Sequence, residues 1–308
     1  ICCCLLLYFF CKDLFILPCT YLAYYMGFDV TINHYTNMIL KSEIATQAII
    51  FFANISAMII SVGLMGLFCS QNLKFSKLFQ KPHKGTLLIS LPIIIAVGIL
   101  GEVVAVAFGK TTSSFGLVFT RINPINISND KTTILCTMIF AVIIVIAQEL
   151  IFRGIILYSL RHFSDSFAII TSSVLFALFQ DGIIEIIASF LFGLALSYFT
   201  IRSSSLYTAI VSRTIFVVIL YLVSISFKYL QYDNALIISL TFCILIFIIS
   251  GLSLIKFAKR DKNAFVLKKP SCNISLRKKI VAFHSTGGFV LFTLLICFHI
   301  LLEIQIIG

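Results

Sequence analysis

Long apolar runs recur along the whole chain, and several of them exceed the roughly 18 residues that mark a membrane-spanning helix. Residues 235–255, for example, contain no charged side chain. A backbone surrounded by lipid must satisfy its own hydrogen bonds, so such runs fold as helices. Of the 308 residues, 60% are hydrophobic and 11% charged, whereas soluble domains are nearer half apolar and a quarter charged. The sequence therefore predicts an all-α, polytopic helical membrane protein and excludes soluble, disordered and coiled-coil classes.

The apolar runs predict eight or nine transmembrane helices. Their ranges are 1–26 (interrupted by Lys12 and Asp13), 45–69, 86–108, 134–160, 167–180, 183–200, 206–227, 235–255 and 287–307. The segment 167–180 is short for a full crossing, but it can serve as a span if other helices bury it.

The charge distribution predicts how the chain is oriented in an integral, multi-pass membrane protein. The 23 Lys and Arg outnumber the 12 Asp and Glu, giving a net charge of +11. Such an excess would suggest nucleic acid in a soluble protein; here it fits basic cytoplasmic loops facing anionic lipid. With nine spans, one set of alternate loops carries fifteen Lys and Arg and the other five, nine of the fifteen lying in 256–286. The N-terminus is predicted to be cytoplasmic and the C-terminus external, with membrane lipids rather than nucleic acid as partners.

The ten cysteines do not indicate a metal site or a disulfide framework. Most lie in or beside apolar runs, and no Cys-x-x-Cys pair with metal-binding spacing occurs. We interpret them as small buried hydrophobic residues. The sequence therefore gives no support for a metal or another cofactor.

Ionisable residues inside the predicted spans are costly in lipid, so each is a candidate functional residue. They are Glu102, Glu149, Arg153, Glu185, Arg213 and Glu303. We interpret Glu102 and Glu303 as structural, because snorkelling and helix pairing relieve much of the cost. Glu149 and Arg153 are spaced i,i+4 with Glu first, the favourable orientation for an ion pair on one helix face.

Further polar residues follow on the next apolar segments. Phe176 and Gln180 are again spaced i,i+4, and Asp181 and Glu185 come directly afterwards. Together with Arg213, they predict a polar chamber at membrane depth. The alternative is that each polar residue serves helix packing alone, with the Glu149 pair as a helix-stapling salt bridge.

Three segments resemble the motifs of the CPBP family, which comprises type II CAAX prenyl proteases and Abi or bacteriocin-processing proteins. Residues 148–154, Gln-Glu-Leu-Ile-Phe-Arg-Gly, look like the Glu-Glu-x-x-x-Arg motif, and residues 172–180 are similar to the second motif, Phe-x-x-x-His. Residues 192–213 are similar to the helix, loop and helix leading to the third motif, His-x-x-x-Asn or His-x-x-x-Asp. The resemblance covers about 134–220, which we take as a CAAX-protease-like core. It is preceded by N-terminal transmembrane helices in 1–133 and followed by C-terminal ones with a basic cytoplasmic loop in 221–308.

The resemblance implies intramembrane proteolysis, in which the first Glu and two His of the family form a catalytic chamber open to the cytoplasmic leaflet. This chain departs from the motifs at the reacting positions. Gln148 stands for the first Glu, Gln180 for the second-motif His, Arg213 for the third-motif His and Val217 for the Asn. Neither glutamine can act as a general base. The residues that match the family are Glu149, Phe152, Arg153, Gly154 and Phe176.

Three functional hypotheses remain open. The first is a catalytically impaired homologue that binds a peptide, lipid or partner protein in its chamber, the peptide being membrane-embedded or prenylated. The second is a divergent, active intramembrane endopeptidase with Glu149 as base, Asp181 or Glu185 as second carboxylate and Arg213 stabilising the oxyanion. The third is a transporter or a bacteriocin-immunity-type protein, although neither duplicated halves nor paired broken helices occur in the sequence. The candidate site positions are Gln148, Glu149, Arg153, Gln180 and Arg213.

Overall fold

The computed structural model describes residues 1–28, 30–32, 39–41, 43–69, 80–82, 84–119, 128–180, 182–260, 267 and 274–306. Over these residues the protein is a helical bundle, which confirms the predicted all-α membrane class. Its helices are α1 (Cys2–Tyr25), α2 (Glu43–Cys69), α4 (Lys84–Ser113), α5 (Lys131–Glu149), the π-helical segment η2 (Leu150–Ile156), α6 (Leu157–Leu160), α7 (Asp165–Leu178), α8 (Ile183–Ser203), α9 (Leu206–Tyr229), α10 (Tyr232–Arg260), α11 (Leu276–His284) and α12 (Gly287–Glu303).

Seven helical segments of the described chain are long and apolar enough to cross a membrane. One of them, Lys131–Leu160, runs continuously through α5, η2 and α6. The C-terminal pair α11 and α12 is bent by 67° and passes the same test only as one broken span, which raises the number to eight. Most of the predicted spans are thus present, but the last one begins after a sharp bend that the hydropathy of 287–307 does not indicate.

The predicted span 167–180 is a short helix in the structure. Helix α7 has 14 residues, about 21 Å at 1.5 Å per residue, whereas the hydrocarbon core is about 30 Å thick. The higher of the two predicted counts, nine spans, is therefore wrong, because it needs this segment to cross the whole membrane. Most of α7 is buried, and it packs along α8, so its polar ends are covered by protein instead of lipid.

Two short antiparallel ribbons join ends of helices. Strand β1 (Val30–Ile32) pairs with β2 (Ile39–Lys41) between α1 and α2. Strand β3 (Leu117–Phe119), shortly after α4, pairs with β4 (Ile304–Ile306), directly after α12. The second ribbon brings together the C-terminal ends of two helices that are far apart in the sequence.

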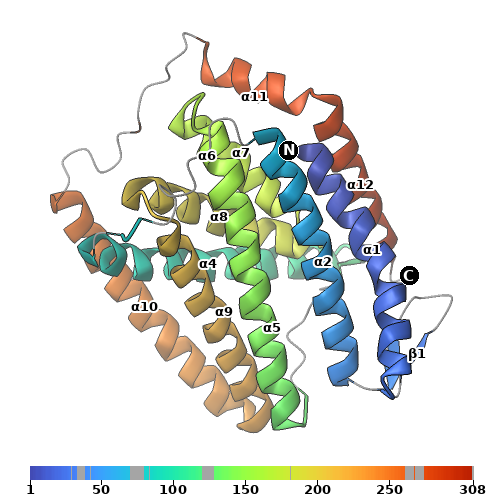
Figure 1. Ribbon diagram of the computed structural model, residues 1–308. Helices are drawn as coiled ribbons and strands as arrows, with labels where there is room; N and C mark the ends of the chain where they lie inside the picture. Colours follow the sequence, from blue (N-terminus) through green and yellow to red (C-terminus); the bar gives the residue numbers. More distant parts are fainter. Residues whose placement is uncertain are drawn as a thin grey trace.

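The long helices do not all run in one direction. In Figure 1, α2, α5, α9 and α10 run lengthwise through the bundle, whereas α4 crosses them and α11 lies across one end. Helix α4 packs against α8 and α10, and α5 packs against α9 and α2. The lipid-facing surface is clearest on α10, where large apolar side chains such as Ile237, Ile244 and Leu252 are exposed. In lipid, exposure of this kind needs no protein partner.

An aromatic cluster ties the N-terminal and C-terminal helices to the middle of the chain. The ring of Phe179 lies 5.1 Å from that of Phe152 on η2 and 5.5 Å from that of Phe9 on α1. Phe9 in turn contacts Phe292 on α12, with ring centroids 6.1 Å apart. Aromatic pairs at these separations add to the packing energy, so the cluster fixes η2 and α7 against the outer helices.

Capping side chains fix where two important helices begin. The carboxylate of Asp130 accepts hydrogen bonds from the backbone N–H and the hydroxyl of Thr133, both at 2.8 Å, at the start of α5. These two bonds hold the pKa of Asp130 below its usual value. The hydroxyl of Ser164 accepts the backbone N–H of Phe167 at the start of α7. Both are ordinary N-caps, and they set the register of the helices that follow.

Glycines on α4 allow a close approach of α8. A Cβ atom at Gly101 would lie 2.8 Å from the backbone oxygen of Ala188, and one at Gly98 would lie 2.8 Å from the ring of Phe216 on α9. Small residues at helix interfaces are the usual means of close packing in membranes. Gly101 is the stricter position, because the atom it would meet belongs to the backbone.

We predict that Gly101→Ala destabilises the protein by about 1–3 kcal/mol, the usual cost of overpacking, because α4 and α8 must move apart. Gly251→Ala on α10 is the matched control, since nothing lies within 4 Å of a Cβ atom there. Thermal unfolding of both variants in the same detergent measures the difference. Equal melting temperatures for the two variants would contradict the close contact between α4 and α8 at Gly101.

Candidate functional site

The candidate site is centred on Glu149, at the junction of α5 and the π-helical segment η2. Glu149 is fully buried, and so are the side chains from Ile151 to Ile156. A π-helical segment within an α-helix is uncommon and occurs frequently at functional sites. Here the segment begins directly after Glu149 and contains Arg153.

The ion pair predicted from the i,i+4 spacing is present. Arg153 Nε lies 3.3 Å from Glu149 Oε2, and both side chains have no exposed surface. Neither of these two atoms makes a hydrogen bond that meets distance and angle requirements. The contact is therefore an electrostatic pair with poor hydrogen-bond direction.

A second arginine reaches the same carboxylate from α9. Arg213 Nη1 donates a 2.7 Å hydrogen bond to Glu149 Oε1, and its Nη2 donates to the side-chain oxygen of Gln148. Arg213 is 8% exposed. Glu149 is thus held between two guanidinium groups, one from its own helical span and one from α9.

Both arginines also contact the ring of Phe176 on α7. The guanidinium carbon of Arg153 lies 4.2 Å from the ring centroid, and that of Arg213 lies 4.5 Å from it. Cation–π contacts of this length are favourable, and more so in a site without water. Phe176 thus holds both guanidinium groups in place.

Helix α8 closes the site through Gly193. The carbonyl oxygen of Gly193 accepts a long, 3.4 Å hydrogen bond from Arg153 Nη2. A Cβ atom here would lie 3.1 Å from the Phe176 ring and 3.4 Å from Arg153 Nη2. Glycine therefore gives the arginine and the aromatic ring the room that they occupy.

A buried hydroxyl cluster lies beside Gly193 and was missed by the sequence reasoning. The Oγ of Ser197 on α8 lies 3.1 Å from that of Ser172 and 3.4 Å from that of Ser173, both on α7. All three are fully buried. The signal was the run of hydroxyl residues at 171–173 within an otherwise apolar segment. The cluster joins α7 to α8 beside Gly193, which also contacts Arg153.

The structure brings Gln148, Glu149, Arg153 and Arg213 together, but it does not bring Gln180 into their network. Gln180 Nε2 donates to the backbone oxygen of Phe176 on its own segment, at 3.2 Å. No hydrogen bond or ion pair joins it to the four residues within the described part of the chain.

No ion pair joins the two described carboxylates, Glu102 and Glu185, to the arginines of this network. Glu185 is in the first turn of α8 and is not among the ion-pair partners of Arg153 or Arg213. Glu102 lies in α4. Asp181 lies outside the described residues, as does the side chain of Glu303.

The donor set does not fit a metal ion. Glu149, the carboxylate of the network, is flanked by two cationic groups, which repel a divalent cation. No group of three His, Cys, Asp or Glu side chains with metal-binding geometry occurs among the described residues.

The positive and negative charges of the described network do not balance. One carboxylate, Glu149, faces two guanidinium groups, Arg153 and Arg213. Removing one partner of a buried ion pair is strongly destabilising because it leaves an uncompensated charge. Removal of the carboxylate and removal of the second cation should therefore have very different effects.

We predict that Glu149→Gln destabilises the protein by about 3–5 kcal/mol, because two buried guanidinium groups lose their carboxylate. Arg213→Gln should cost much less, because it leaves the neutral Glu149–Arg153 pair and a side chain able to bond Gln148. Unfolding curves of both variants in one detergent provide the comparison. An Arg213→Gln variant as unstable as Glu149→Gln would rule out this charge balance.

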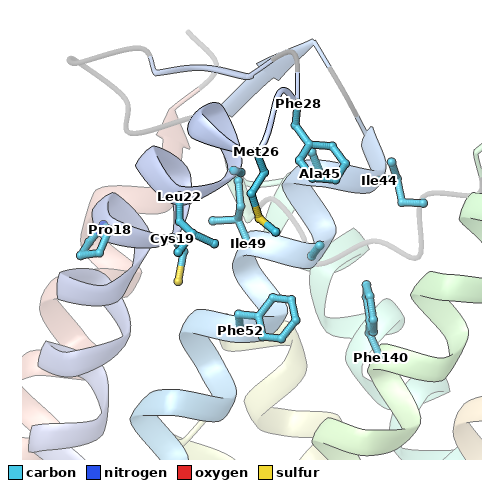
Figure 2. A pocket seen from close by; sticks show the side chains of 12 residues that line it. Pro18, Cys19, Leu22, Met26, Phe28, Ile44, Ala45, Ile49, Phe52 and Phe140 are labelled. Atoms are coloured by element: carbon cyan, nitrogen blue, oxygen red, sulfur yellow. The ribbon is translucent and has the colours of Figure 1, made fainter.

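The structure also contains an apolar pocket of about 490 Å³ away from this network. Figure 2 shows that it lies among α1, α2 and α5, with Leu22, Ile49, Phe52 and Phe140 facing it. Phe140 precedes Glu149 by nine residues on α5, roughly 14 Å along the helix axis. Among the described residues, those that line the pocket carry no charged side chain.

One comparison with known proteins gives a match. Residues 130–219 match the family model described as Rce1-like, type II CAAX prenyl endopeptidase Rce1-like. The match runs from the cap of α5 into α9 and contains all the residues of the site. The resemblance to the CPBP family, expected over 134–220, is thereby confirmed. No curated protein and no solved structure matches the chain.

Proposed function

Starting from the Rce1-like character of residues 130–219, we propose that this integral membrane protein binds a peptide, lipid or partner protein in its polar chamber without cleaving it. The proposal rests on the contacts of the Glu149 carboxylate. Each oxygen of its carboxylate faces a guanidinium group, Oε1 at 2.7 Å and Oε2 at 3.3 Å. A general base must lie within hydrogen-bond reach of the water that it activates, and the Glu149 side chain has no exposed surface.

The neighbouring side chains support the same proposal. Gln148 uses its side-chain oxygen to accept from Arg213, and an amide cannot take a proton from water at neutral pH. Gln180 bonds back to its own segment. Arginine keeps its proton under physiological conditions, so Arg213 contributes charge and hydrogen bonds instead of proton transfer.

We predict no cleavage of a quenched prenylated peptide or of a transmembrane-peptide library by the purified protein in detergent. The wild type and Glu149→Gln should both give the background rate, because neither presents a free base to water. An active endopeptidase of this family, assayed alongside, shows that the substrates are competent. Thermal unfolding establishes that the wild-type sample is folded. Turnover by the wild type that disappears in Glu149→Gln would overturn the proposal in favour of a divergent protease.

We further propose that the N-terminus is cytoplasmic and that anionic lipids are partners of the same side. Helix α11 supports this arrangement: it lies across one end of the bundle (Figure 1), with Arg277 and Lys278 exposed. Lys279 Nζ donates a 2.8 Å hydrogen bond to the backbone oxygen of Phe163, which holds α11 against the turn after α6. Exposed basic side chains near a membrane surface favour the anionic cytoplasmic leaflet.

We predict that an epitope at the N-terminus is digested by protease only after the cytoplasmic face of oriented vesicles becomes accessible. Digestion of this epitope in intact vesicles that expose only their external face would contradict the proposed orientation.

A further inference from the structure

We propose that the two arginines of the chamber form a binding site for one carboxylate group of a membrane-embedded ligand. This inference rests on the proposed function, because it names the ligand chemistry of the same chamber. Among the described residues, Arg153 and Arg213 have Glu149 as their shared carboxylate partner. The described network therefore carries one positive charge in excess at membrane depth.

The excess charge is buried, and burial makes it costly. Arg153 has no exposed surface and Arg213 is 8% exposed. A cationic side chain in the membrane interior pairs with an anion or faces a cavity, because lipid gives it no counter-charge. A ligand that brings one negative charge neutralises the site. A phosphomonoester, with nearly two charges, would reverse the imbalance instead of removing it.

Arg153 also has donors that are poorly satisfied. Its Nη1 is buried without a hydrogen-bond partner, its Nε faces Glu149 Oε2 at 3.3 Å without a well-directed bond, and its Nη2 has only the long bond to Gly193. Buried guanidinium donors are normally satisfied, and a carboxylate matches their fork geometry with two parallel bonds. The poorly satisfied donors of Arg153, and Nη1 above all, thus favour the same ligand class as the charge.

Arg213 is the most exposed of the three charged side chains of the site. It retains some exposure, and its partner Gln148 is half-buried, whereas Glu149 and Arg153 are closed off. The ligand carboxylate therefore approaches from the side of Arg213 and Gln148. Either a fatty acid or the free C-terminus of a peptide supplies this group, and the experiment separates the two sources.

The test compares each carboxylate with its uncharged counterpart on the intact protein in nanodiscs of zwitterionic lipid at pH 8. The probes are oleate against methyl oleate, and an apolar peptide with a free C-terminus against the same peptide amidated. The wild type should bind at least one carboxylate probe about ten-fold or more tighter than its uncharged partner, since a hydrogen bond to a charged group is strong enough for that factor. A preference within the oleate pair identifies a fatty acid as the source of the carboxylate, and a preference within the peptide pair identifies a peptide C-terminus.

Two variants and a control make the test specific. Arg213→Gln removes the excess charge and should abolish the preference, while leaving the neutral Glu149–Arg153 pair and a folded protein. Arg161→Gln, which removes a partly exposed arginine paired with Asp165, should keep it. Asp181→Asn should also keep it, because the ligand and not Asp181 supplies the balancing charge.

Three results would overturn the inference. They are equal binding of charged and uncharged probes by the wild type, a preference that survives in Arg213→Gln, or a preference that appears only in Asp181→Asn. Cleavage of the peptide probe is followed in the same samples. If the peptide is cleaved and the carboxylate preference is present, only the proposed non-catalytic function is refuted. If there is neither cleavage nor a carboxylate preference, only the carboxylate site is refuted.

Discussion

The rest of the chamber depends on the burial of Glu149 between Arg153 and Arg213. In lipid a lone carboxylate or guanidinium is costly, and pairing is the main way to reduce that cost. The Glu149–Arg153 pair within the span Lys131–Leu160 joins α5 to η2, and the bond from Arg213 adds α9. Phe176 brings in α7 by contacting both guanidinium groups, and Gly193 brings in α8. Four separate segments thus meet at one ionic contact.

That contact explains two irregular features of the fold. A π-helical segment places Arg153 and its neighbours in a wider turn directly after Glu149, and a departure from the regular α-helix at membrane depth is tolerated because protein buries the segment. Helix α7 is too short to cross a bilayer alone, yet it supplies Phe176 and the serines that join α8. Both irregularities place side chains at membrane depth where a regular, full-length helix would continue into lipid.

The sequence predicted those features that depend on local spacing. The apolar runs gave the membrane class and most of the spans, and the i,i+4 spacing gave the Glu149–Arg153 pair. The contact between Glu149 and Arg213 joins positions 64 residues apart, and residue spacing alone does not predict such a contact; the resemblance to a family only indicated a shared chamber. The π-helical segment, the role of Gly193 and the bend before α12 depend on how neighbouring helices pack. Hydropathy does not contain that information.

The residues that replace the motif Glu and His in the chamber determine which chemistry it can perform. Where the resembled motifs have Glu and His, which exchange protons near neutral pH, this chain has Gln148, Gln180 and Arg213. Amides and guanidinium groups donate and accept hydrogen bonds without changing their charge under these conditions. Such a set cannot move a proton, but it can hold an anionic group in a fixed position. The same substitutions that remove the base therefore add a permanent positive charge. For that reason binding, and in particular binding of a negatively charged group, is the function that this chamber supports best.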